Sequence, residues 1–508
     1  MGNRKSILEM DAKEARTFLI KPTSYVPFAM PEYFNFTKII ENAKKCFKGI
    51  NDVHAIGGKK MENLGNINHT MFMNKDGNYD WRPITIVHPL AYIGLAYFIT
   101  EESAWQIIKE RFKEFRKNPR IKCISLPVES TGKNNDREET ILNWWENLEQ
   151  ATIRFSLNYQ YCIKTDITNC YGSIYTHSIA WAIDGKKEAK KKNSKDFGAK
   201  LDKRVREVQY GQTNGILQGG QVYNLVAEIV MGYADMVLSE RLNSILSSKE
   251  KEDYQIIRYR DDYRIFSNSR EIAEKIVKTL AEVLAELNMH FNQKKTSDSS
   301  NVIKTAIKPD KLFWTSEKGN IRVKDSDGTY TYQLNLQKHL WLIKRLADKY
   351  PNSGSLTVAL SDFYKRIKNE GLSHSQIPQL ISILTDLIIN SPKSIPNEVL
   401  ILGEIFNKLN DNEISEYIDL IMKKVSRKAN TEYSEIWLQR LSIMINYKYV
   451  YKGKLAKKVT SNSIKVWNSD WCKEDINFNE DCLIDYEKKD RVNSIIPENS
   501  ILLFDNTY

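Results

Sequence analysis

Two adjacent aspartates set between two apolar runs constrain the fold more than any other feature of this sequence. Residues 255–267 read QIIRYRDDYRIFS, so Asp261 and Asp262 have strand-forming residues on both sides. This pattern predicts a β-hairpin with the acidic pair at its tip. Two carboxylates on an apolar hairpin are costly unless they face water or a metal ion. From these residues alone, an ordinary solvated turn remains the alternative.

A third aspartate is placed to join that pair. Residues 160–166, QYCIKTD, predict a strand that ends at Asp166. If this strand and the hairpin are neighbours in one sheet, three carboxylates meet at its edge. Two-metal phosphoryl transfer needs such a cluster, because Mg²⁺ prefers hard oxygen ligands. We therefore expect Asp166, Asp261 and Asp262 to hold two ions, Mg²⁺ or Mn²⁺.

The overall composition limits the class of protein. The chain has 508 residues and a formal charge of +11, which suits a nucleic-acid backbone or an anionic membrane. No apolar run approaches the roughly 18 residues of a membrane span. The six cysteines contain no CxxC pair and predict reduced thiols in a cytosolic protein. The lysine-rich stretch 186–206 is either a contact to RNA phosphates or a solvated loop.

Six segments resemble the motifs of reverse transcriptases, in the order of that family. YRDD at the hairpin tip resembles the Tyr-x-Asp-Asp motif, and the details are most similar to the bacterial abortive-infection and defence-associated reverse transcriptases, the AbiK-like group. The segments are WRPITIVHP (81–89) and RIKCISLP (120–127) of the fingers, KTDITNCYGSIYTHSI (164–179) of motif A, TNGILQGGQVYN (213–224) of motif B, YRDD (259–262) of motif C and LNMHFNQKKT (287–296) of motif D.

The resemblance and the residue pattern together imply an α+β polymerase followed by an all-helical domain. We expect an N-terminal helical extension over 1–78 and reverse-transcriptase fingers and palm, with an antiparallel catalytic sheet, over 79–325. Helical periodicity recurs from 336 to 446 and predicts a stack of helical hairpins in place of a thumb, over 326–450. A mixed segment, 451–508, completes the chain.

The resemblance also implies a role for individual residues. Tyr171 matches the steric gate that crowds a ribose 2′-hydroxyl and so favours deoxynucleotides. Gln218 and Gly219 match the motif B turn that lets the backbone approach nucleotide and template, and Lys295 matches the motif D lysine that protonates pyrophosphate. Two cations of the fingers motifs are further candidates for holding the triphosphate, Arg82 and Lys122. Each of these side chains also has an ordinary structural interpretation.

The implied function is synthesis of DNA from dNTPs in antiphage defence in the bacterial cytoplasm. The resemblance leaves open an RNA template, a protein primer or untemplated synthesis, with Tyr508 as a candidate priming residue. It further implies RNA and DNA as partners, a structured non-coding RNA among them, and a homo-oligomer. Two alternatives stay open: an RNA-dependent RNA polymerase, which Tyr171 disfavours, and a catalytically idle nucleic-acid-binding scaffold.

Overall fold

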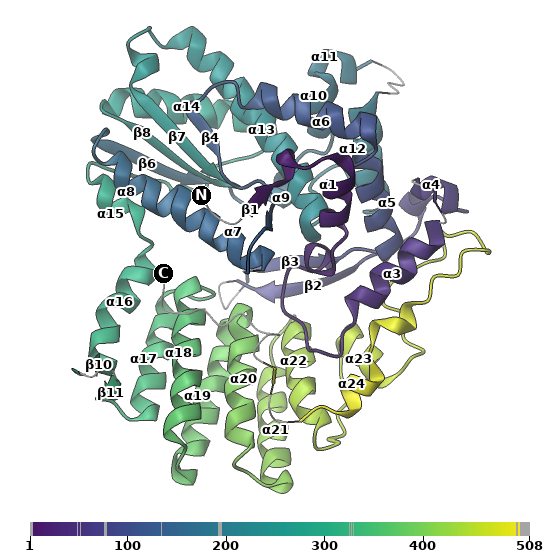
Figure 1. The fold of residues 1–508 in the computed structure, drawn as a ribbon, viewed down its shortest axis with the longest axis vertical. Helices are drawn as coiled ribbons and strands as arrows, with labels where there is room; N and C mark the ends of the chain where they lie inside the picture. Colours follow the sequence, from purple (N-terminus) through teal and green to yellow (C-terminus); the bar gives the residue numbers. More distant parts are fainter. Residues whose placement is uncertain are drawn as a thin grey trace.

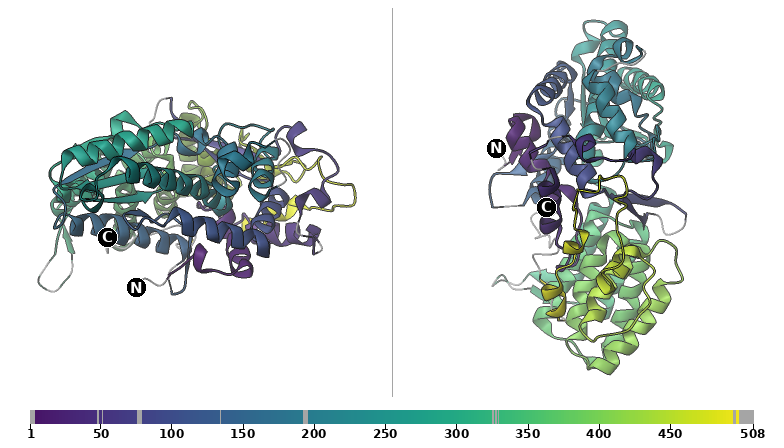
Figure 2. Two further views of the ribbon diagram at one scale, coloured as in Figure 1. Left: turned by 90° about the horizontal axis from the view of Figure 1, so that it is seen from above. Right: turned by 90° about the vertical axis from the view of Figure 1, so that its right-hand side faces the viewer.

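The computed structural model places the chain in two lobes, which we call the sheet lobe and the helical lobe (Figure 1). The structure describes residues 4–47, 49–50, 52–75, 79–133, 135–191, 196–324, 326, 328, 330–493 and 496–497. In side view the two lobes are stacked, with the C-terminal segment lying across the helical lobe and reaching the sheet lobe (Figure 2).

A five-stranded sheet forms the centre of the sheet lobe, in the order β4-β7-β8-β6-β9. The three central strands are antiparallel, as expected, whereas β4 at one edge runs parallel to β7. The central strands are rich in isoleucine because both faces of the sheet are buried. The strands are β4 (Ile121–Cys123), β6 (Tyr161–Asp166), β7 (Tyr254–Tyr259), β8 (Asp262–Ser267) and β9 (Ser297–Ser299).

Helices cover both faces of this sheet. The helices α13 (Gly220–Ile245) and α14 (Arg270–Glu286) lie on one face, where Ile256 and Ile265 join the main core. A smaller core on the other face includes Ile257 and Phe266. The helices that border this second core are α7 (Asp136–Trp144), a π-helical turn (Trp145–Gln150), α8 (Ala151–Phe155) and α15 (Val302–Ala306).

Helix α13 bears on the expectation that no segment of the chain spans a membrane. By length and composition it is the one helix, among the residues that the structure describes, that could cross a membrane. However, 72% of its most apolar window is buried inside the protein. Its apolar surface is therefore explained by packing between the sheet and its neighbouring helices.

The N-terminal part of the sheet lobe packs beside the sheet as a helical layer with the β2–β3 hairpin at its lower edge (Figure 1). The elements are β1 (Arg4–Ser6), α1 (Ala12–Leu19), α2 (Pro22–Tyr25), α3 (Phe36–Phe47), α4 (Val53–Ile56), β2 (His69–Asn74), β3 (Trp81–Ile86), α5 (Pro89–Ile99), α6 (Glu102–Phe115) and β5 (Val128–Ser130). Between β6 and α13 the chain adds α9 (Cys170–Ser173), α10 (His177–Asp184), α11 (Lys186–Ala189) and α12 (Phe197–Glu207).

The helical lobe is the predicted stack of helical hairpins. Helix α16 (Pro309–Ile321) already packs on α17 and α18, so the stack begins upstream of residue 326. The remaining elements are β10 (Arg322–Lys324), β11 (Tyr330–Tyr332), α17 (Leu336–Lys349), α18 (Gly354–Glu370), α19 (Ile377–Asn390), α20 (Ile395–Phe406), α21 (Asp411–Val425) and α22 (Glu432–Ile443).

The C-terminal segment, which carried no clear pattern in the sequence, joins the two lobes. It contains α23 (Lys454–Thr460) and α24 (Tyr486–Asp490), joined by irregular chain. An isolated bridge pairs Phe34 with Ile484, and the buried Trp467 indole donates to the Ile86 carbonyl at 3.0 Å. These contacts tie the end of the chain to its beginning.

Candidate active site at the strand ends

The three aspartates predicted to converge come together at one end of the strands, where β6 ends and β8 begins. Asp166 is the last residue of β6 and Asp262 the first of β8, and the two lie directly opposite each other in the antiparallel register. Asp261 precedes Asp262 in the hairpin turn, and its carbonyl accepts a hydrogen bond from the Ile167 amide at 3.1 Å. The strand and hairpin predicted from the sequence are therefore neighbours, as the cluster required.

The hairpin turn that presents Asp261 has an unusual backbone conformation. Arg260 adopts a left-handed conformation with φ +56°. A residue with a Cβ is disfavoured there, so surrounding contacts must hold it. Its amide donates to Ser125 Oγ at 2.8 Å, and its carbonyl accepts from Arg258 Nη1 at 3.3 Å.

Crowding of like charges changes the electrostatics of the cluster. Burial, followed by the charges of Asp261 and Asp166, raises the pKa of Asp262 to about 7. Burial and the charge of Asp166 also raise the pKa of Asp261. The predicted motif D lysine lies here too, since Lys295 Nζ is 2.8 Å from Asp166 Oδ2. Although burial opposes the charge of Lys295, the contact with Asp166 leaves its pKa raised.

The chemistry of this cluster suits divalent cations. Its ligands are hard carboxylate oxygens on rigid strand ends, and a cation between them would relieve the repulsion that raises the pKa of Asp262. In the part of the chain that the structure describes, no three His, Cys, Asp or Glu side chains are gathered closely enough to hold an ion unaided. Other ligands, such as substrate phosphates and water, would complete the coordination.

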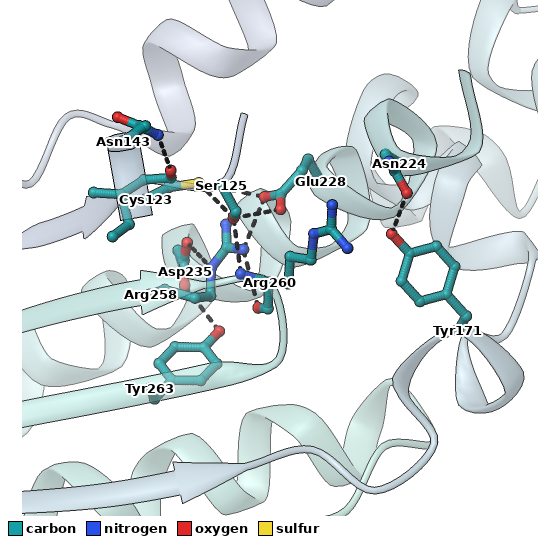
Figure 3. Close-up of polar contacts among 11 residues, drawn as sticks. Cys123, Ser125, Asn143, Tyr171, Asn224, Glu228, Asp235, Arg258, Arg260 and Tyr263 are labelled. Carbon is teal, nitrogen blue, oxygen red and sulfur yellow. Dashed lines mark hydrogen bonds and ion pairs between the residues drawn. The ribbon is translucent and has the colours of Figure 1, made fainter. Parts of the chain in front are cut away.

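Tyr171 is held beside the cluster by a partner that the sequence reasoning missed. It lies in α9, and its hydroxyl donates to Asn224 Oδ1 on α13 at 2.6 Å (Figure 3). The Asn224 amide in turn donates to Gln221 Oε1 at 2.8 Å. The Tyr171 carbonyl accepts from the Ile216 amide at 2.8 Å, so both ends of the tyrosine are anchored to motif B. Asn224 is three residues after Gln221, a helical spacing that could have signalled the pair.

Gln218 and Gly219 lie where motif B meets the fingers hairpin. The Gln218 carbonyl accepts from the Thr85 amide at 3.0 Å. A Cβ on Gly219 would lie 2.5 Å from Val87 Cγ2, so only glycine fits against this strand end. The structure therefore gives Gly219 a packing reason; the predicted approach to nucleotide stays a prediction.

The two remaining described candidates lie on other strands, Lys122 on β4 and Arg82 on β3. Lys122 on β4 donates to Asn147 Oδ1 at 3.2 Å, and it pairs in register with Ile257, whose side chain is in the second core. It is therefore on the side of the sheet that faces α7 and α8. Arg82 is exposed on β3. Tyr508 lies outside the described residues.

Arg82 belongs to a group of cations between the lobes, and one member of this group, Lys308, also acts on Asp262. Although the Lys393 side chain is accessible, surrounding protein and then the charges of Arg137, Lys308 and Arg82 lower its pKa to about 8. Four cations therefore come together where the helical lobe faces β3 and α7. The basic stretch 186–206 is partly accounted for by ion pairs, since Arg204 Nη2 is 2.9 Å from Asp52 Oδ1.

The fold and the acidic strand ends together define a polymerase palm, and comparison with known proteins identifies its class. Residues 74–321 match the sequence model of the reverse transcriptase (RNA-dependent DNA polymerase) family. This part of the chain is a reverse transcriptase domain, and the protein is an RNA-directed DNA polymerase by class. No curated protein matches the chain.

Solved structures of telomerase are also similar to the chain. Apo telomerase from Candida tropicalis is 13% identical, with a TM-score of 0.29 over 77% of this chain and 67% of that one. Telomerase from Candida albicans in complex with a fragment of telomeric RNA is 10% identical, with a TM-score of 0.30 over 71% and 66%. The chain thus spans about two thirds of the length of these telomerase chains.

Proposed function

We propose that the protein synthesises DNA from deoxynucleoside triphosphates by two-metal phosphoryl transfer. The observation that carries the proposal is the register of Asp166 opposite Asp262, with Asp261 in the adjoining turn. These carboxylates would hold two Mg²⁺ or Mn²⁺ ions, which supply the charge that activates the attacking hydroxyl and steadies the pyrophosphate. Lys295, whose Nζ lies 2.8 Å from Asp166 Oδ2, would give the proton to the leaving pyrophosphate.

Tyr171 supports DNA rather than RNA as the product. Its ring lies beside motif B and is anchored by Asn224, where it would meet a ribose 2′-hydroxyl. A side-by-side assay of ribonucleotides and deoxynucleotides separates this proposal from an RNA polymerase.

The biological setting of the proposal rests on the motif resemblance alone. It is antiphage defence in the bacterial cytoplasm, by a homo-oligomer that copies an RNA, extends a protein primer or works without a template. Sequencing the nucleic acid that copurifies with the protein, before and after protease, tests these routes. DNA released only by protease would establish protein priming, and its sequence would reveal any template.

The catalytic assignment is tested by the double variant Asp261→Asn with Asp262→Asn. Nucleotide incorporation should be lost while circular dichroism and the melting temperature show a folded protein. Incorporation retained by a folded double variant would overturn the assignment and favour an idle scaffold for the palm.

A further inference from the structure

A buried cluster of charged and polar side chains lies directly beneath the hairpin turn that carries Asp261 (Figure 3). Its centre is Arg258 on β7, whose side chain is 0% exposed, between Glu228 and Asp235 of α13, which are 3% and 4% exposed. Ion pairs so deeply buried are strongly destabilising when one partner is missing. Because these ion pairs lie beneath an active-site turn, they can also fix the backbone of that turn.

The cluster has two halves with different neighbours. In the lower half, Arg258 Nε donates to Asp235 Oδ2 at 2.8 Å and the Tyr263 hydroxyl donates to Asp235 Oδ1 at 3.0 Å. Both partners of this half lie within the core. In the upper half, Arg258 Nη1 donates to Glu228 Oε2 at 2.8 Å and Ser125 Oγ donates to Glu228 Oε1 at 2.5 Å.

Ser125 connects the upper half to the turn. A hydroxyl has one hydrogen, and Ser125 gives it to Glu228. Its oxygen is then free to accept the Arg260 amide, 2.8 Å away. The Arg260 carbonyl is bound from the same cluster by Arg258 Nη1 at 3.3 Å. Both backbone groups of the left-handed residue before Asp261 are therefore fixed from below.

We propose that Ser125 and Glu228 are positioning residues that set the direction in which Asp261 is presented. The Glu228 carboxylate orients the Ser125 hydroxyl, and that hydroxyl holds the Arg260 amide and so the left-handed turn. Without this contact the turn relaxes and the Asp261 carboxylate moves from its place near Asp166. The role given to Asp261 rests on the proposed function, whereas the control of its position rests on the contacts.

The test compares Ser125→Ala with Asp235→Asn. The first variant removes the contact to the turn and leaves both ion pairs of Arg258. The second weakens the lower ion pair and leaves every contact to the turn. Each protein is measured for kcat and KM with deoxynucleotides, for Mn²⁺ affinity without substrate by electron paramagnetic resonance, and for melting temperature.

If the cluster positions Asp261, Ser125→Ala lowers kcat about tenfold with little change in KM, and weakens Mn²⁺ binding about fivefold. Asp235→Asn should lower the melting temperature more but keep kcat within about twofold. Ser125→Thr restores the hydroxyl and should recover kcat and Mn²⁺ affinity.

Two results would overturn the proposal. One is that kcat and Mn²⁺ affinity of Ser125→Ala equal those of the unchanged protein. The other is that both variants lose activity in proportion to their loss of melting temperature. If the unchanged protein incorporates no nucleotide, the proposed function fails, but the Mn²⁺ measurement still decides whether Ser125 positions the carboxylate.

Discussion

The acids at the strand ends and the acids of the buried cluster beneath them are the same kind of side chain in opposite circumstances. Glu228 and Asp235 share the Arg258 guanidinium, and each accepts a hydroxyl hydrogen bond as well. At the strand ends one cation, Lys295, lies within ion-pair distance of Asp166. The nearby charges of Lys308 and Arg260 offset only part of the repulsion among the three carboxylates.

This difference separates a structural role from a functional one. Despite complete burial, the charge of Arg258 lowers the pKa of Glu228. At Asp235 burial outweighs the same charge and leaves the pKa raised, so Arg258 balances the cluster unequally. At the strand ends burial and repulsion raise the pKa of Asp262 to about 7, so charge there is unfavourable until a cation arrives. Strained, unbalanced charge of this kind is typical of active sites.

The largest expected effect is loss of activity without loss of stability at the strand ends. Asp166→Asn should reduce nucleotide incorporation about 1,000-fold or more, because it removes a predicted metal ligand. It should leave the melting temperature at pH 8 unchanged or higher, since one of three repelling charges disappears. Primer extension and thermal unfolding measure the two properties.

Asp298 offers a matched control for that variant. It lies on β9 of the same sheet, opposite Ile163 of β6, and pairs with Arg270 at 3.0 Å. Asp298→Asn should keep full incorporation. If Asp166→Asn and Asp298→Asn reduced nucleotide incorporation equally, Asp166 would have no catalytic role that distinguishes it from another acid of the same sheet.

The buried cluster should show the opposite behaviour, loss of stability. Arg258→Met leaves two buried carboxylates without their cation and should cost about 3–5 kcal/mol of unfolding free energy. Chemical denaturation measures this cost. The triple variant with Glu228→Gln and Asp235→Asn added should recover much of it, because no uncompensated charge remains. A cost below about 1 kcal/mol for Arg258→Met would contradict the comparison.

A third, smaller effect concerns pH and metal. An acid whose pKa is raised in the fold holds its proton more tightly, so protons compete with metal as the pH falls through about 7. The metal concentration that gives half-maximal incorporation should therefore be about tenfold higher at pH 6 than at pH 8. Added metal should restore the rate at pH 6. A half-saturating concentration that is the same at both values would show that Asp262 does not titrate with metal binding.

The features predicted correctly from the sequence are those with local signals. The hairpin around Asp261, the strand that ends at Asp166 and the helices of the second half follow from the spacing of apolar residues along the chain. Lys295 of motif D contacts Asp166, and its role toward pyrophosphate stays a prediction. Such elements are encoded within a dozen residues, so a single sequence is enough to find them.

Features that depend on distant parts of the chain could not be predicted. Ser125 acts on the turn from 135 residues away, and Trp467 meets Ile86 across 381 residues, so neither contact leaves a spacing in the sequence. The place of Lys122 in the sheet likewise depends on the pairing of β4 with β7, which are more than 130 residues apart in the chain. Long-range packing, which sequence patterns do not contain, decides such positions.

The smallest expected effect concerns the Tyr171 hydroxyl. This group is uncharged and lies near the hairpin turn that carries Asp261. If the hydrogen bond to Asn224 fixes the ring, Tyr171→Phe and Asn224→Leu should each reduce the preference for deoxynucleotides over ribonucleotides about threefold to fivefold. The double variant should be no worse than either single one, because both remove the same bond. The ratio of kcat/KM for the two nucleotide classes measures this. Multiplying losses in the double variant would show that the two side chains act independently and that the hydrogen bond between them does not fix the preference.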